Sequence, residues 1–428
     1  MLHRIIAVLL LLFLATVGVN WPSLPFNASV ADLIFVPLAV SVLILPLPWL
    51  SWQRADLVVV LYLLGAVPVI VVSTDTHASV VELVRELYLV AIYFVMAILA
   101  KRKSDAIIGI GLAIGGMFLS ITGLFFVARQ LIGSAPFPPM GEVMTLPYLG
   151  NVLRLRAFTA SEAMLACLLT AAVPFAIWWC QRDRGGYWIV AAMTFAAMLT
   201  FSHAFAGFVA AFVIVLWPSL GRWPRRFAAA AAIVVVIGLN VAATASIKSI
   251  DYRGSSYTDA SQYHYAIEER RVRIGGATIV YNVMSYARIK EVAWHTFLEH
   301  PIAGIGLDRF HIATGRAFTD GRLPSEYREI DPHSTVLGRF AECGLIGGAT
   351  LLMLWIAWAV MAREVASRST IGYAGAAALA GLVVSSLNAD IMNFRFLWVV
   401  AGLMRGLQEA NGITIASGRD ETFTAGTD

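Results

Sequence analysis

The sequence contains few charged residues for its length. Only 14% of its 428 residues are Asp, Glu, Lys or Arg, whereas 59% are hydrophobic, and the mean hydropathy is +0.75. A soluble protein of this size needs more charge to keep its surface solvated. Apolar windows of about 20 residues, long enough to cross roughly 30 Å of hydrocarbon, recur along the chain. They are too uniformly apolar for the strands of a membrane barrel, in which apolar and polar residues alternate. The composition therefore predicts an all-α integral membrane protein.

Cysteine is scarce as well. Cys167, Cys180 and Cys343 lie in or at the ends of apolar runs, and the polar segment 247–334 has none. Neither a disulfide framework nor a zinc site is therefore expected. No internal repeat indicates the two-fold architecture of many transporters. We expect no metal, no cofactor and no nucleic-acid partner.

The apolar windows predict a polytopic bundle of about twelve transmembrane helices. The predicted spans cover about 5–20, 30–50, 57–73, 80–100, 106–131, 159–180, 187–201, 205–220, 227–246, 335–361, 371–387 and 391–406. Residues 1–246 thus hold about nine spans with short connections, 335–407 hold about three more, and 408–428 form a tail. The segment 247–334 is left as a large, partly helical loop.

Lys and Arg indicate the orientation of these spans. They gather in the connections on one side, at Arg54, Lys101, Arg102, Lys103, Arg182, Arg184, Arg222, Arg225, Arg226, Arg363 and Arg368. By the positive-inside rule this side is the cytoplasm, so both termini are cytoplasmic and the large loop lies outside. Residues 1–20 also fit a signal peptide, whose removal would leave the other spans oriented as they are.

The large loop has a soluble-like composition. It begins with the polar stretch "DYRGSSYTDASQYHY", which we predict to be irregular, and it continues into a predicted helix over about 281–299 that Pro301 ends. Gly304 and Gly306 follow. They suit tight turns where the chain closely approaches a neighbour.

The end of the loop carries the polar stretch "DPHS" directly before an apolar run. Asp331 is suited to cap a helix and Pro332 to open it, which would place His333 in the first turn. Backbone N–H groups at such a position bind phosphate, and the helix dipole disfavours the imidazolium. We therefore expect a neutral His333 that can accept a proton. The alternative is that these residues only cap a helix at the membrane surface.

Charged residues inside apolar spans are costly, so each is expected to face the bundle interior, a cavity or a partner. Such residues are Arg85, Glu86, Arg339, Glu342 and Arg395. Apart from Arg395, they lie toward the same predicted outer side as Arg154, Arg156, Arg288 and His333. The alternative is structural ion pairing, such as Arg339 with Glu342 at i and i+3.

Several arginines and a histidine at an outer membrane face suit one chemical task. Arginine binds phosphate oxygens in pairs and keeps its charge, so it can stabilise a diphosphate leaving group without a metal. A neutral histidine can remove the proton from an incoming hydroxyl. No Asp-x-Asp pair that would hold a metal occurs in the outer segments.

Four stretches resemble the bacterial O-antigen ligase and O-antigen polymerase superfamily of membrane glycosyltransferases. They are "RLRAFTASEAMLACLLTAAVP", "LTFSHAFAGFVAAFVIVL", "ARIKEVAWHTFLEHPIAGIGLDRF" and "PHSTVLGRFAECGLIGG". The resemblance implies transfer of a glycan from undecaprenyl diphosphate to an acceptor hydroxyl at the periplasmic face of the inner membrane. By position, it implies that His333 activates the acceptor and that Arg288 and Arg156 engage the diphosphate.

Two positions depart from the family pattern. Ser334 follows the motif histidine where the family often has asparagine, and His203 stands where it often has arginine. A protonated His203, or Arg154, could replace that arginine as a phosphate contact. Arg85 and Arg339 are further candidates for binding the diphosphate or the glycan.

The acceptor stays open at this stage. A ligase passes a finished glycan to the lipid A core, whereas a polymerase passes a growing chain to another lipid-linked repeat unit. Both reactions need the same contacts to the donor and the same base. A transporter is the alternative of another class, and it predicts repeated halves with charges near the bilayer midplane.

Overall fold

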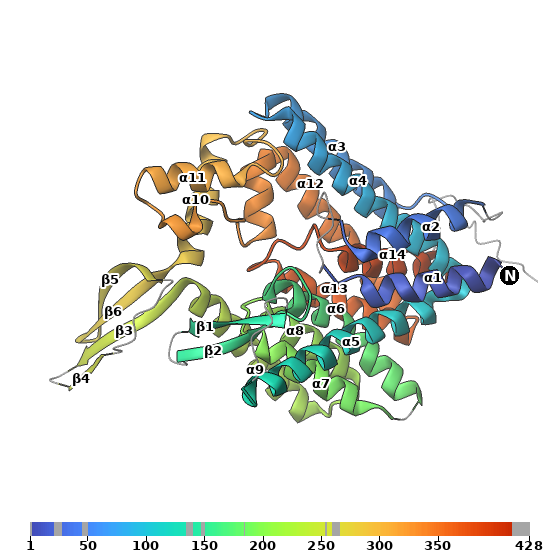
Figure 1. Cartoon of the computed structure of the whole chain (residues 1–428), viewed down its shortest axis with the longest axis horizontal. Helices are drawn as coiled ribbons and strands as arrows, with labels where there is room; N and C mark the ends of the chain where they lie inside the picture. The colour runs from blue at the N-terminus through green and yellow to red at the C-terminus, as the bar shows by residue number, and fades with distance from the viewer. Residues whose placement is uncertain are drawn as a thin grey trace, which may run out of the picture.

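The computed structural model describes residues 2–20, 28–44, 50–133, 140–146, 150–183, 185–252, 255–258 and 266–412. Most of them are helical, and every predicted span contains a helix (Figure 1). Before the large loop these helices are α1 (Leu2–Thr16), α2 (Val30–Ile44), α3 (Arg54–Val72), α4 (Thr76–Leu99), α5 (Asp105–Leu131), α6 (Glu162–Asp183), α7 (Tyr187–Leu199), α8 (Phe205–Leu216) and α9 (Arg222–Thr244). After it come α12 (Thr335–Ala366), α13 (Thr370–Ser385) and α14 (Arg395–Ala410).

The helices have the length and composition of a multi-pass membrane protein. Within the described residues, 5 helical stretches are long and apolar enough to cross a membrane, and one of them, Thr76–Leu131, contains both α4 and α5. Between these two helices the backbone angles of Arg102 and Lys103 are non-helical. Other apolar helices have only 10–17 residues, so the count of about twelve spans stays a prediction.

α6 and α14 form the centre of the bundle. α6 is buried along nearly its whole length, and α14 is buried from Phe396 to Gln408. α13 packs against α6 and α8, where a Cβ on Gly207 would lie 2.1 Å from the carbonyl oxygen of Gly381. Because glycine lets helices approach closely inside a membrane, the backbones of α8 and α13 come close together at this crossing.

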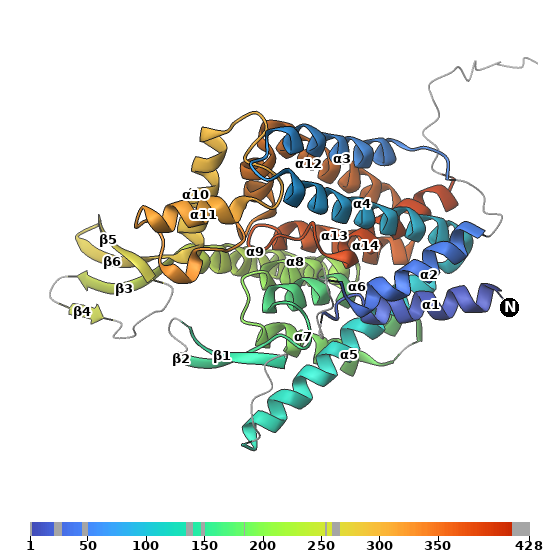
Figure 2. The same cartoon turned by 45° about the horizontal axis from the view of Figure 1, so that its top comes forward.

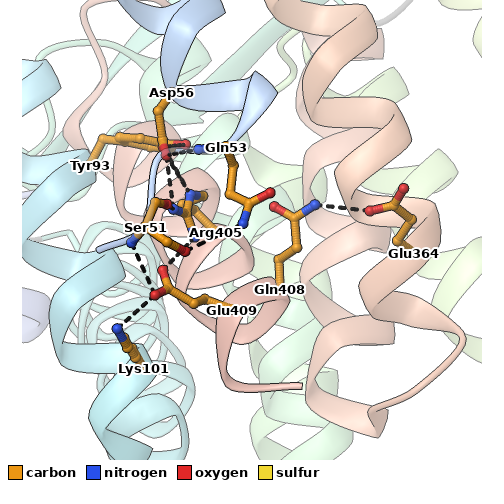
Figure 3. Close-up of polar contacts among 9 residues, drawn as sticks. All are labelled: Ser51, Gln53, Asp56, Tyr93, Lys101, Glu364, Arg405, Gln408 and Glu409. Carbon is orange, nitrogen blue, oxygen red and sulfur yellow. Dashed lines mark hydrogen bonds and ion pairs between the residues drawn. The ribbon is translucent and has the colours of Figure 1, made fainter. Parts of the chain in front are cut away.

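Polar side chains fix the C-terminal end of α14 to its neighbours (Figure 3). The Arg405 guanidinium donates to Asp56 of α3, with Nε and Oδ1 2.9 Å apart, and to Glu409 at 3.0 Å. Asp56 also accepts from the Tyr93 hydroxyl of α4 at 3.0 Å, and Glu409 accepts from Lys101 at 2.6 Å. Arg405 is completely buried. Its charge is therefore matched by hydrogen-bonded carboxylates, as burial of an ion requires.

The large loop contains a β-sheet, which corrects the all-α prediction. Among the described residues, β3 (Ala245–Tyr252), β4 (Ser255–Thr258), β5 (Ala266–Ile274) and β6 (Ala277–Met284) form an antiparallel sheet in the order β4-β3-β6-β5. β3 directly follows α9, which lies at the edge of the bundle, and the sheet extends away from the helices (Figures 1 and 2). A separate hairpin of β1 (Gly141–Leu146) and β2 (Gly150–Leu155) lies between α5 and α6 in the chain.

The sequence of β6 has a composition typical of strands, which the prediction of helices did not take into account. The segment "ATIVYNVM" of β6 is rich in β-branched residues, which favour strands. Gly275 and Gly276 both have positive φ angles and form the two-residue turn between β5 and β6. Part of the polar stretch predicted to be irregular lies in β3 and β4, and residues 259–265 fall outside the described residues.

Two helices complete the large loop beyond the sheet. α10 (Ser285–Glu299) starts later than predicted because β6 continues to Met284, and it ends just before Pro301, as predicted. α11 (Phe310–Thr319) packs against α10, and both helices contact α12. The buried side chains of Ile289 and Phe310 belong to the small apolar core that these helices share.

The glycines after α10 fit against a break in α12. Gly344 interrupts that helix with φ +60° and ψ −157°, and the N–H of Gly306 donates to the carbonyl oxygen of Glu342 at 3.0 Å. A Cβ on Gly304 would lie 2.2 Å from the same oxygen. The predicted close approach of Gly304 and Gly306 to a neighbour is therefore confirmed, and their neighbour is α12.

Candidate functional site

His333 lies in the connection that leads into α12. The helix begins at Thr335 with Ser334 in the N-cap position, so the prediction that Asp331 caps it and Pro332 opens it is wrong. Ser334 is also a residue type that favours the N-cap. His333 therefore precedes the first turn instead of lying in it.

The start of α12 is bonded to the connection between α13 and α14. The N–H of Thr335 donates to the carbonyl oxygen of Ser386 at 3.0 Å, and its hydroxyl donates to that of Ala389 at 2.9 Å. Beside this anchor, His333 has a φ of +48°. A left-handed conformation costs a non-glycine residue roughly 1–3 kcal/mol and persists only where its surroundings enforce it. Such strain is typical of functional positions.

Tyr286 lies between two histidine rings. Its ring stacks on His333, with centroids 4.5 Å apart and planes 19° from parallel. His203, in the turn between α7 and α8, contacts Tyr286 at a centroid distance of 5.1 Å. Because Tyr286 belongs to the first turn of α10, the contact joins both histidines to the start of that helix.

Lys290 follows Tyr286 by one helical turn and lies on the same face of α10. Its half-buried ammonium donates to Oδ1 of Asn388 at 2.8 Å. Asn388 in turn donates through Nδ2 to Asn240 of α9 at 3.0 Å. A chain of hydrogen bonds thus holds the ammonium between α10, α9 and the α13–α14 connection.

Arg154, at the end of β2, brings a second cation to this cluster. Its Nε donates to the carbonyl oxygen of Thr200, which ends α7, at 3.3 Å. Its guanidinium also lies 3.6 Å from the Glu162 carboxylate. Arg156 follows two residues later, and its backbone N–H donates to the carbonyl oxygen of Met140 at 2.8 Å.

The surroundings of the two histidines keep both imidazoles neutral. Burial lowers the pKa of His333 to about 4, and the positive charges of Lys290 and Arg154 lower it further in the same direction. Burial also lowers the pKa of His203 to about 4, with Arg154, Lys290 and His333 adding to the effect. A neutral His333 agrees with the sequence-based expectation, but burial and cations cause it, since the helix start lies beyond it.

Arg288 contacts other residues than those that Tyr286 and Lys290 contact. It pairs with Glu291 of α10 at 2.6 Å and with Glu268 of β5. Two residues along a helix correspond to roughly 200°, so Arg288 and Tyr286 lie on opposite faces of α10. The structure therefore groups Arg288 with the sheet of the large loop.

Arg339 and Arg85 are both engaged by carboxylates of α4. Arg339 forms a buried ion pair with Glu86 and lies over the Tyr62 ring at 4.4 Å. Arg85 pairs with Glu82 at 2.7 Å. The alternative pairing of Arg339 with Glu342 is wrong, because the Glu342 carboxylate accepts from the backbone N–H of Phe310 at 3.1 Å.

Residues 188–352 match the protein-family model described as O-antigen ligase. The matched region is therefore similar to the O-antigen ligase family. It contains His203, Tyr286, Lys290 and His333, and the resemblance to the O-antigen ligase and polymerase superfamily is thereby confirmed. No curated protein matches the chain.

Sequence reasoning missed three residues around His333. Tyr286 and Lys290 could have been found, because their spacing of four places them on one face of the predicted helix. Asn388 carried no such signal, since only the folded chain brings the α13–α14 connection to α10.

Proposed function

We propose that the protein transfers a glycan from undecaprenyl diphosphate to an acceptor hydroxyl during surface polysaccharide biosynthesis. The observation that carries the proposal is the neutral His333, which is stacked on Tyr286 and lies near the positive charges of Lys290 and Arg154. His333, Tyr286 and Lys290 lie in the region that matches the O-antigen ligase model, and Arg154 precedes it in the chain. A neutral imidazole can accept a proton, and cations beside it can bind an anionic leaving group.

In the proposed reaction His333 takes the proton of the acceptor hydroxyl. The hydroxyl oxygen then forms a bond to the anomeric carbon of the glycan, and the bond from that carbon to the diphosphate oxygen breaks. The leaving undecaprenyl diphosphate keeps the electron pair of this bond. Arginines stabilise its charge without a metal ion, because the guanidinium binds phosphate oxygens and stays protonated.

Arg154 is the arginine best supported as a diphosphate contact, because its charge acts on both histidines. Arg156 and Arg288 are proposed to engage the same diphosphate. His203 with a pKa of about 4 is neutral near pH 7, so we assign it hydrogen bonding instead of the charge that a protonated ring would supply.

Arg85 and Arg339 stay in the proposal as binding residues for the diphosphate or the glycan. Both already pair with glutamates, at 2.7 Å for Arg85 and through a buried contact for Arg339. A phosphate would therefore have to share or replace these partners. This makes them weaker candidates than Arg154.

The proposed orientation places both termini in the cytoplasm and the reaction at the periplasmic face of the inner membrane. Residues 1–246 and 335–407 would form the membrane body, 247–334 the periplasmic loop and 408–428 a cytoplasmic tail. Support comes from the basic residues on one side of the predicted spans and from the sheet and α10 on the other.

The acceptor is proposed to be the lipid A core, with a lipid-linked repeat unit as the second candidate. The second candidate corresponds to an O-antigen or exopolysaccharide polymerase of the same superfamily. The description of the matching family names an O-antigen ligase. The two activities differ in their products, because a ligase defect leaves lipid-linked polymer unattached, whereas a polymerase defect leaves single repeat units attached.

Complementation of a strain that lacks its surface polysaccharide tests the proposal. The wild-type gene should restore full-length glycan, and His333→Ala and Arg288→Ala should not, at equal protein level in the membrane. His295→Ala is the matched control, because His295 is exposed on the same helix as Arg288. Full glycan from both site variants would contradict the proposed mechanism.

A further inference from the structure

Lys290 is held in place without an ionic partner. Among the described residues its ammonium forms no ion pair, and it donates a hydrogen bond to the neutral amide of Asn388 at 2.8 Å. Burial lowers its pKa. A half-buried ammonium with a neutral partner has donors left for an anion.

The charged and titratable groups that face His333 come from three elements. α10 supplies Tyr286 and Lys290, β2 supplies Arg154, and the α7–α8 turn supplies His203. The two cations differ in one respect, because the Arg154 charge is partly offset by Glu162 at 3.6 Å. The Lys290 charge therefore acts on His333 without a compensating carboxylate of its own.

We propose that Lys290 is a positioning residue that makes proton acceptance by His333 depend on the bound diphosphate of the donor. The inference rests on the proposed function and deepens it. In the free protein the ammonium opposes formation of an imidazolium at His333. When the diphosphate binds, its negative charge offsets the ammonium, and the imidazole becomes able to take the acceptor proton.

The consequence is an order of events at the site. The hydroxyl proton moves to His333 only while the leaving group is present, so the bond to the anomeric carbon forms as the bond to diphosphate breaks. Without the donor, the acceptor hydroxyl keeps its proton.

The titration of His333 tests this proposal directly. Protein labelled with ¹⁵N-histidine is placed in lipid nanodiscs and titrated from about pH 2.5 to pH 8, so that the range extends below the His333 pKa of about 4, with the His333→Gln spectrum used to assign the signal. The probe for the diphosphate is farnesyl diphosphate, which carries no glycan. The variants are Lys290→Met, which removes the charge, and Lys290→Arg, which keeps it. Lys248→Met is the matched control, because Lys248 pairs with Glu269 on the distant sheet.

In the free protein, Lys290→Met should raise the pKa of His333 by about one unit, while Lys290→Arg and Lys248→Met leave it unchanged. Farnesyl diphosphate should raise the pKa of His333 by about one unit in the wild type. The rise should be much smaller in Lys290→Met, because the ammonium that holds the diphosphate beside His333 is gone. In Asn388→Leu the ammonium keeps its charge but loses its hydrogen-bond partner. The rise in the pKa of His333 on binding farnesyl diphosphate should then lie between the rise in the wild type and that in Lys290→Met.

An unchanged pKa of His333 in Lys290→Met, or an equal response of both proteins to farnesyl diphosphate, overturns the inference. Failure of the proposed function is distinguishable from this result. It would appear as a wild-type protein that transfers no glycan although the pKa of His333 still responds to Lys290 and to the probe.

Discussion

At the scale of single residues, buried arginines of this molecule form ion pairs with specific carboxylates. Arg405 is matched by Asp56 and Glu409, and Arg395 is matched by Asp32 at 2.5 Å. Lys290 instead has an amide as its partner. Because this ammonium is half-buried and has only an amide as partner, it keeps donors for an anionic ligand.

The buried pair of Arg339 and Glu86 allows a structural role to be separated from donor binding. Arg339→Met leaves a buried carboxylate without its cation, which should cost about 3–5 kcal/mol of stability and lower the unfolding temperature in nanodiscs. The double variant Arg339→Met with Glu86→Leu should recover much of that loss. Arg322→Met, at an exposed pair with Asp320, is the control and should leave the temperature unchanged.

Transfer activity of the double variant then decides the role of Arg339. Near wild-type activity would show that the arginine serves the fold alone. A stable but inactive double variant would support Arg339 as a contact to the diphosphate or the glycan.

At the scale of secondary-structure elements, the sequence predicted the positions of the bundle helices well, because apolar windows of this length have few other stable forms in a membrane. The sheet was missed because Asp, Gly and Ser in "DYRGSSYT" favour turns, although part of this segment lies in strands. The start of α12 was placed too early because Asp331 and Ser334 are both good caps. The stack of Tyr286 on His333 joins distant segments, which no local pattern could predict.

Because α12 is interrupted at Gly344, adding one methyl group there should lower the stability of the protein. A Cβ there would lie 2.4 Å from the backbone of Ile302, and φ is +60°. Gly344→Ala should therefore cost at least roughly 1–3 kcal/mol and loosen the loop that follows α10. Gly238→Ala in α9 is the control, because a Cβ on Gly238 would meet no described atom within 4 Å and alanine favours a helix.

Protease digestion of the large loop in intact nanodiscs measures the difference between these two glycine variants. Faster cleavage after α10 in Gly344→Ala, with no change in Gly238→Ala, is the expected result. Equal cleavage of the two variants would mean that the contact between α12 and Ile302 does not hold the loop.

At the scale of the whole molecule, the region that matches the O-antigen ligase model spans the contact between the membrane body and the large loop. Its matched residues run from α7 through the sheet and α10 into α12. Arg154, which lies before the matched region, nevertheless reaches the α7–α8 turn at Thr200. The candidate site thus depends on the folding of segments that are far apart in the chain.

The two neutral histidines link the stability of this assembly to pH. Both have a pKa of about 4 in the folded protein, against 6.5 for an ordinary histidine. Between pH 6.5 and about 4 the unfolded chain therefore binds more protons than the folded one, so the free energy of unfolding falls as the pH falls. Above pH 6.5 the contribution of the two histidines is complete.

The double variant His203→Gln with His333→Gln cannot take up these protons, so its unfolding temperature in nanodiscs should fall less steeply across the same pH range. His295→Gln, which removes an exposed histidine, should follow the wild type. Parallel curves for the wild type and the double variant would mean that the two imidazoles are already accessible to protons in the folded state. In that case the pKa of both histidines in the folded protein would lie near 6.5, and neither burial nor the charges of Lys290 and Arg154 would lower it.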